Sequence, residues 1–209
     1  MDRQRALSIV RATSIVLVIV AIVVPAFDLI SEGRFDPTRF FAYFTIQSNV
    51  IGVATFAWLI AIGRGRRPPA LDRLRGAAAL YLIVTFFVVI FLLSGVDVQL
   101  ELAWVDFVLH KLFPVVVVLD WVIDPPLTRI NWRDVGIWLI YPIIWAVITV
   151  IRGALDGWYP YPFLDPDKAG GYGQVAIVIA AITAGFIIIG AIIRAIGNAR
   201  HMRMSQPEI

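Results

Sequence analysis

Runs of about 20 apolar residues, separated by short polar connectors, restrict the fold of this chain more than any other feature. A helix of about 20 residues crosses the hydrocarbon core of a bilayer and satisfies its own backbone hydrogen bonds there. Hydrophobic residues make up 60% of the sequence, whereas roughly half is typical of soluble domains. We therefore expect a single all-α domain over residues 1–209, a polytopic membrane protein with six transmembrane helices. The expected spans cover about residues 8–30, 40–62, 77–95, 104–123, 134–152 and 174–196.

The charges in the connectors indicate how these helices are oriented. Arginine is concentrated at both termini and in the second and fourth connectors, residues 63–75 and 124–134. The other three connectors are mostly acidic and cover residues 31–39, 95–101 and 152–171. Because arginine-rich loops remain on the cytoplasmic side, we predict that both termini are cytoplasmic. The short loops fit the inner (plasma) membrane of a bacterium.

The remaining composition excludes several classes of site. The chain has no cysteine and only two histidines, His110 and His201, so we expect no metal site and no cofactor. Its net charge of +3 comes from arginines in connectors and not from one basic face. We therefore expect no nucleic-acid partner, and we expect membrane lipid as the surroundings.

Polar residues interrupt the second span in the stretch FTIQSN, residues 44–49. Thr45, Ser48 and Asn49 share one helix face. With a helix starting near residue 40, Thr45 would lie roughly 8 Å below the outer surface, at 1.5 Å of rise per residue. Polar groups in hydrocarbon cost free energy unless they find partners. These residues therefore predict either a polar site or hydrogen bonds within and between helices.

The fourth span carries a histidine at a similar depth. His110 lies roughly 9 Å inside a helix that starts near residue 104, and an ionisable residue within a span favours a functional role. Asp106 lies one turn earlier on the same face, where it also suits the positive end of the helix. Asp120 and Asp124 follow the same stripe near the inner end, and we interpret them as structural or helix-end charges.

The last connector contains a stiff aromatic segment, GWYPYPFLD, residues 157–165. Its prolines fix φ at their own positions and restrict the residues that precede them. We predict that Tyr161, Pro162 and Phe163 form either a lid over the mouth of the bundle or an aromatic anchor at the membrane surface.

Four motifs follow one another along the chain: FTIQSN at 44–49, HKLFP at 110–114, Tyr141–Pro142 with Trp145, and YPFLD at 161–165. Together they resemble the androgen-induced and androgen-dependent TFPI-regulating proteins, which are six-helix membrane proteins. The resemblance covers about residues 7–196, and this chain has Asp165 where the animal proteins have Glu. It implies an intramembrane threonine hydrolase that cleaves fatty acid esters of hydroxy fatty acids, with Thr45 and His110 as the essential pair.

The chemistry of ester hydrolysis assigns further expected roles around this pair. The Thr45 hydroxyl needs a base, and a neutral His110 imidazole can accept its proton. Asp106, or alternatively Asp28, would hold the imidazole in the required tautomer. Either of two side chains on the Thr45 face would donate a hydrogen bond to the oxyanion, Ser48 or Asn49.

The implied substrate has long apolar chains and a free carboxylate. The chains would remain among the helices, in a site near the outer leaflet, and a cation would bind the carboxylate, either Arg152, Arg39 or Lys111. The main alternative is a transporter or channel for an ion or small molecule, since the polar stripe of the fourth span reaches Asp124. A second alternative is a membrane scaffold without catalytic activity.

Overall fold

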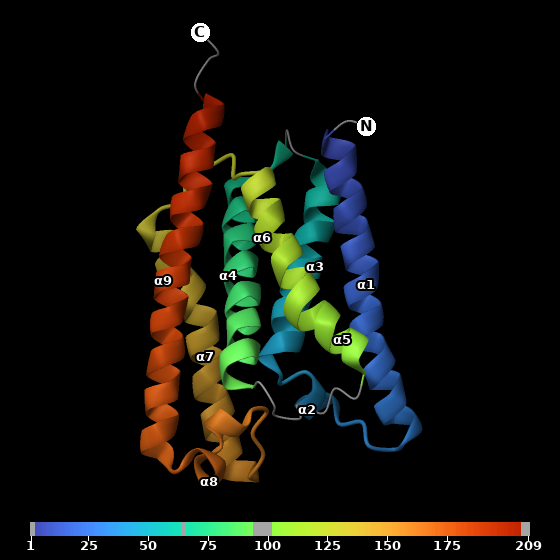
Figure 1. Cartoon of the computed structure of the whole chain (residues 1–209), viewed down its shortest axis with the longest axis vertical. Helices are drawn as coiled ribbons and strands as arrows, with labels where there is room; N and C mark the ends of the chain where they lie inside the picture. Colours follow the sequence, from blue (N-terminus) through green and yellow to red (C-terminus); the bar gives the residue numbers. More distant parts are fainter. Residues whose placement is uncertain (1–2, 64–65, 94–101, 206–209) are drawn as a thin grey trace.

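The computed structural model describes residues 3–63, 66–93 and 102–205, with side chains through residue 199, and every element in these ranges is a helix. The elements form one bundle, and both ends of the chain lie at the same end of it (Figure 1). In chain order the elements are α1 (Arg3–Ser31), α2 (Pro37–Phe40), α3 (Phe44–Ile62), α4 (Pro69–Leu92), α5 (Ala103–Phe107), η2 (Val108–Leu112), α6 (Phe113–Ile123), α7 (Trp132–Asp156), η3 (Pro162–Leu164), α8 (Pro166–Ala169) and α9 (Tyr172–Ser205).

Five helices are long and apolar enough to cross a membrane: α1, α3, α4, α7 and α9. They match five of the expected spans, although their ends differ. The third span was expected at 77–95, but α4 already begins at Pro69, because proline is favoured in the first turn of a helix. The acidic connector at 95–101, with the end of that expected span, lies outside the described residues.

The fourth expected span does not form one α-helix. Residues 103–123 are helical throughout, but the π-helix η2 separates α5 from α6. Pro114 follows η2 and has no N–H to bond the carbonyl four residues earlier, which belongs to His110. The wider turn therefore lies where the regular hydrogen-bond pattern is interrupted, and such turns are frequent at functional sites.

The second span begins later than its expected start near residue 40. Asp36 caps the short helix α2 by accepting hydrogen bonds from the backbone N–H groups of Thr38 and Arg39. The chain then turns, and α3 begins at Phe44. Thr45 therefore lies in the first turn of its helix, so the expected depth of roughly 8 Å within that helix is wrong.

Helix α4 is the centre of the bundle and packs against α3, α6, α7 and α9. Its inner face is rich in small residues, and Gly76 lies so close to the indole of Trp138 on α7 that an added Cβ would come within 2.3 Å of the ring. The outward faces of the surrounding helices are apolar and exposed, as at Val16, Ile148 and Ile188. Exposed aliphatic faces of this kind suit contact with lipid.

A cluster of paired charges lies at the end of the bundle that holds both termini, where α1 and α4 begin and α6 ends. We name it the inner charge cluster, and its members are all buried: Arg11, Arg67, Asp72, Arg75, Asp120 and Asp124. Arg11 contacts Asp120 at 2.7 Å and Asp124 at 2.6 Å, while Arg75 contacts Asp120 at 2.8 Å. These contacts join three helices, which agrees with the structural interpretation of Asp120 and Asp124.

Two of the arginines in this cluster come from the second connector, where the sequence suggested only a topology signal. Arg67 instead donates to Asp124 at 3.0 Å and to the carbonyl of Pro125 at 2.7 Å. Asp72 accepts hydrogen bonds from the backbone N–H groups of Leu127 and Thr128. The second and fourth connectors are therefore held together by buried ion pairs and hydrogen bonds.

Candidate active site

A hydrogen-bonded chain of three side chains joins α3 to the π-helix. The Oγ1 atom of Thr45 lies 3.2 Å from Nε2 of His110, and Nδ1 of His110 lies 2.9 Å from Oδ1 of Asp106. Thr45 and His110 are buried, whereas Asp106 is partly exposed and also accepts from Lys111 Nζ at 2.9 Å. With Nδ1–H donated to the carboxylate, Nε2 of a neutral imidazole is left to accept the proton of Thr45.

His110 lies in the π-helix η2, one turn after Asp106 in α5. Asp106 and His110 are four residues apart, so their side chains lie on one face and meet. The turn also presents the carbonyl of Leu109 to α3, where Asn49 Nδ2 donates to it at 3.1 Å. The same amide donates to the Thr45 carbonyl at 2.8 Å, which ties the two elements together at the site.

Ser48 and Asn49 therefore lie beside Thr45, but their donors are directed at its backbone. Ser48 Oγ donates to the Thr45 carbonyl at 3.1 Å, and Asn49 donates to that same oxygen. Both amide hydrogens of Asn49 are thus engaged, one with Thr45 and one with Leu109. These contacts hold the first turn of α3 in place and so position the Thr45 side chain.

Tyr161 contacts the nucleophile candidate directly, which the sequence did not indicate beyond a place in the lid. Its hydroxyl oxygen accepts from the Thr45 backbone N–H at 3.2 Å and lies 3.2 Å from Thr45 Oγ1. Burial raises the pKa of Tyr161 to about 12, so the hydroxyl keeps its proton and can donate it in a hydrogen bond. In the sequence, only the stiff YPYPF motif indicated a role for Tyr161, and this motif does not predict that its hydroxyl contacts Thr45.

Residues 161–163, predicted to form either a lid or an aromatic anchor, are a folded segment beside Thr45. Pro162 opens the 3-10 turn η3, and Tyr161 stacks on Phe163 with the ring centroids 5.2 Å apart. On α7, the ring of Trp145 lies 6.0 Å from that of Tyr161, and its Nε1 donates to the carbonyl of Ala42 at 2.9 Å. The segment therefore contacts Thr45 through the hydroxyl of Tyr161.

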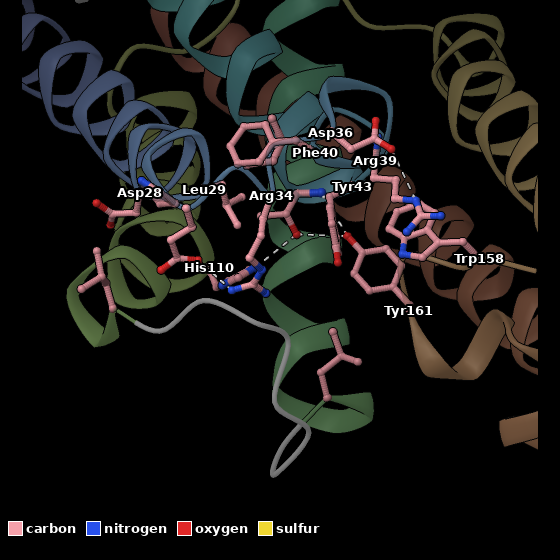
Figure 2. A pocket seen from close by; sticks show the side chains of 16 residues that line it. Asp28, Leu29, Arg34, Asp36, Arg39, Phe40, Tyr43, His110, Trp158 and Tyr161 are labelled. Atoms are coloured by element: carbon pink, nitrogen blue, oxygen red, sulfur yellow. Dashed lines mark hydrogen bonds and ion pairs between the residues drawn. The ribbon is translucent and has the colours of Figure 1, made fainter.

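Two cavities that differ in polarity share Thr45 in their linings. The first, which we name the charged cavity, has a volume of about 740 Å³ and is lined by His110 together with charged side chains such as Arg34 and Asp36. Figure 2 shows His110 and Tyr161 facing this cavity from different elements. The second, which we name the apolar pocket, has a volume of about 540 Å³ and lies among α4, α7 and α9. Three residues line both cavities: Thr45, Leu93 and Tyr161.

The candidates for binding a substrate carboxylate have different surroundings. Arg152 donates to the carbonyl and hydroxyl of Thr38 and is not among the residues that line either cavity. Lys111 is paired with Asp106. Arg39 does line the charged cavity, although it contacts Asp36 at 3.5 Å and lies over the Trp158 ring.

The alternative partner for the imidazole also lies at the charged cavity. Asp28 lines this cavity from α1. The carboxylate that the structure places on His110 Nδ1 is nevertheless that of Asp106. Among the described residues, no group of three or more His, Asp or Glu side chains is arranged to hold a metal ion.

Fold and site together define a class: a helical protein with helices suited to a membrane and a buried threonine, histidine and aspartate in one hydrogen-bonded chain. No family model, no curated protein and no solved structure matches this chain. Its function is therefore inferred from the geometry of the site, with the resemblance of the four motifs as support.

Proposed function

We propose that this protein is an intramembrane hydrolase of lipid esters, with Thr45 as the nucleophile. The observation that carries the proposal is the chain from Thr45 Oγ1 through His110 to Asp106, which ends at a cavity. A nucleophile, a base and a group that orients the base are the parts of an acyl-transfer site. The resemblance of the motifs supports fatty acid esters of hydroxy fatty acids as the substrate class.

In the first half of the reaction, Thr45 Oγ1 forms a bond to the ester carbonyl carbon while His110 Nε2 takes the hydroxyl proton. The carbonyl oxygen becomes an oxyanion, and the Tyr161 hydroxyl lies near enough to Oγ1 to stabilise this charge. The C–O bond to the alcohol then breaks, and His110 gives its proton to the leaving oxygen. Asp106 stabilises the imidazolium that exists between these two transfers.

In the second half, water cleaves the acyl-enzyme. His110 takes a proton from water, the water oxygen bonds to the acyl carbon, and the bond to Thr45 Oγ1 breaks as His110 returns the proton to it. The products are a free acid and the original threonine. Thr45 occupies the first turn of the 19-residue helix α3, and the positive end of the helix dipole favours the negative charge that develops there.

The proposal places the chain in a bacterial inner membrane with six spans and both termini in the cytoplasm. Residues 103–123 would form the remaining span, which is the fourth in chain order. They are helical throughout and about 20 residues long. The site then lies near the outer leaflet, at the end of the bundle opposite the termini (Figure 1). Water reaches Thr45 from that side.

The transporter alternative has less support. A transport path would continue from the site towards the other end of the bundle, but that end holds the inner charge cluster, whose arginines and aspartates are paired with one another. The scaffold alternative does not account for an imidazole that is held by a carboxylate and directed at a hydroxyl beside a cavity.

The test is hydrolysis by purified protein in detergent, with a fatty acid ester of a hydroxy fatty acid as the substrate and released acid measured by mass spectrometry. Thr45→Ala should abolish turnover. Thr55→Ala is the matched control, because Thr55 is a buried threonine on the same helix whose hydroxyl bonds only within that helix, to Ile51 O at 2.7 Å. Turnover by Thr45→Ala at the wild-type rate would exclude Thr45 as the nucleophile.

A further inference from the structure

We infer that the two halves of the ester bind in different cavities: the acyl chain in the apolar pocket and the leaving alcohol, which carries polar or charged groups, in the charged cavity. The inference rests on the proposed function and adds the orientation of the substrate and the chemical class of its alcohol. Three observations carry it, namely the position of His110, the lining of each cavity and the place where the cavities join.

His110 determines the side on which the alcohol leaves. The imidazole must protonate the leaving oxygen, so that oxygen must come within hydrogen-bond reach of Nε2. His110 lines the charged cavity and is not among the residues that line the apolar pocket. The alcohol therefore lies in the charged cavity, and the acyl chain extends from the carbonyl carbon in the other direction.

The apolar pocket has the lining that an acyl chain requires. It is walled by aliphatic and aromatic side chains from α4, α7 and α9, such as Val88, Leu139 and Ile182. An alkyl chain can pack against such a wall without leaving buried polar groups unpaired. Ile143 and Val147 line this pocket and also belong to the exposed apolar face of α7. A chain can therefore enter it sideways from lipid.

The charged cavity suits a hydrophilic alcohol. Its wall combines charged side chains with apolar ones such as Leu29, Phe40 and Ile46. The charged lining residues are Asp28, Glu32, Arg34, Asp36 and Arg39. Arg34 is paired with Glu32 at 2.7 Å, and both side chains remain about half exposed. The charged groups can bind hydroxyl, carboxylate or phosphate groups on an alcohol, and the apolar side chains on the same wall can contact its carbon atoms.

The place where the cavities join determines which cavity receives each half of the ester. Thr45 and Tyr161 line both cavities, so the carbonyl carbon lies between them when Oγ1 attacks. The new Oγ1–C bond leaves the acyl group in the apolar pocket, while the broken C–O bond releases the protonated alcohol into the charged cavity. Water takes the place of the alcohol beside His110 Nε2 and cleaves the acyl-enzyme from the same side.

The test narrows the apolar pocket and compares esters in which the long chain is on opposite sides of the carbonyl. Ala146 lines the pocket on α7, and Ala146→Phe fills part of it. Ala154→Phe is the matched control, because Ala154 is on the same helix, is exposed and lines neither cavity. The substrates are glyceryl monoacetate, glyceryl monopalmitate and hexadecyl acetate.

The inference predicts that wild type hydrolyses glyceryl monopalmitate faster than hexadecyl acetate. Ala146→Phe should lower kcat/KM for the palmitate by about tenfold or more, while the monoacetate is hydrolysed as by wild type, which also shows that the variant is folded. Ala154→Phe should leave kcat/KM for all three esters unchanged.

A selective loss of hexadecyl acetate hydrolysis in Ala146→Phe would reverse the orientation and overturn the inference. An equal effect on all three esters, or none on any, would also overturn it, since the pocket would then not hold the acyl chain. If wild type hydrolyses neither these esters nor fatty acid esters of hydroxy fatty acids, the proposed function itself is contradicted. That result is distinct from a failure of the inferred orientation, in which wild type is active.

Discussion

Two clusters of buried polar side chains share one helical segment of this protein and have different surroundings. Residues 103–123 carry His110 near one end and Asp120 near the other. Around His110, the chain of hydrogen bonds ends at Thr45 and Tyr161, which both face cavities. Around Asp120, every described contact is with another member of the inner charge cluster or with backbone. A buried polar group that faces a cavity is available for chemistry, and one enclosed by its partners is available for stability.

The two clusters also differ in charge. The inner charge cluster contains three arginines and three aspartates, so its formal charges cancel. At the candidate active site, the carboxylate of Asp106 is shared between His110 and Lys111. Removing a charge therefore has different consequences at the two places. In the inner charge cluster, removing a charge leaves a buried ion without its partner. At the candidate active site, removing the charge of Asp106 mainly changes how the imidazole is held.

Among substitutions that leave Thr45 and His110 in place, Asp106→Asn should have the largest effect and should act on activity alone. An amide in this position stabilises neither the required tautomer nor the imidazolium, and comparable changes in triads lower kcat by about 10³- to 10⁴-fold. The measurement is kcat in the ester assay, beside thermal unfolding in detergent. Asp28→Asn serves as the control on the same cavity, and a larger loss from Asp28→Asn would make Asp28 the orienting residue.

Asp124→Asn should have the opposite profile. Asp124 is fully buried and paired with Arg11 and Arg67, so neutralising it should lower the free energy of unfolding by about 3–5 kcal/mol. The kcat of the folded fraction should stay at the wild-type value. Asp167→Asn, at an exposed position outside the cluster, should change neither quantity. A loss of kcat without loss of stability in Asp124→Asn would erase the distinction between the two clusters.

Tyr161→Phe should lower kcat by about 10²- to 10³-fold, since it removes a single donor beside Thr45 Oγ1. KM should change little, because the ring remains stacked on Phe163. Tyr43→Phe is the matched control, since Tyr43 lines the same cavity and its ring packs edge-on against Tyr161. Equal kcat values for the two variants would remove Tyr161 from the reaction.

Ser48→Ala should have the smallest effect. Its hydroxyl donates to the Thr45 carbonyl, so the loss should lower the free energy of unfolding by about 1 kcal/mol. If Ser48 instead donates to the oxyanion, kcat should fall about 100-fold. Unfolding and ester hydrolysis measured on one preparation decide between these roles.

The sequence predicts the parts of this fold that depend on local patterns. Hydropathy located the long helices, and helical spacing placed Asp106 beside His110, because both signals are carried by neighbouring residues. The start of α3 was misplaced, because Asp36 caps the separate helix α2 and the chain turns before Phe44.

Contacts between distant parts of the chain were not predictable from these patterns. The arginines of the second connector predict only on which side of the membrane that connector lies. The contact between Arg67 and Asp124 forms only in the folded chain. The Tyr161 hydroxyl reaches Thr45 across 116 residues of sequence. Helical periodicity contains no information about either pairing, since it describes one helix at a time.

The most direct test of the central claim is the site of covalent modification by a fluorophosphonate. The activated hydroxyl attacks phosphorus and displaces fluoride, so the phosphonyl group marks the nucleophile. Intact-protein and peptide mass spectrometry should find a single adduct, on the peptide that contains Thr45, and Thr45→Ala and His110→Ala should remain unmodified. An adduct on another residue, or an unmodified wild type that is folded, would contradict the assignment of Thr45 and His110 as nucleophile and base.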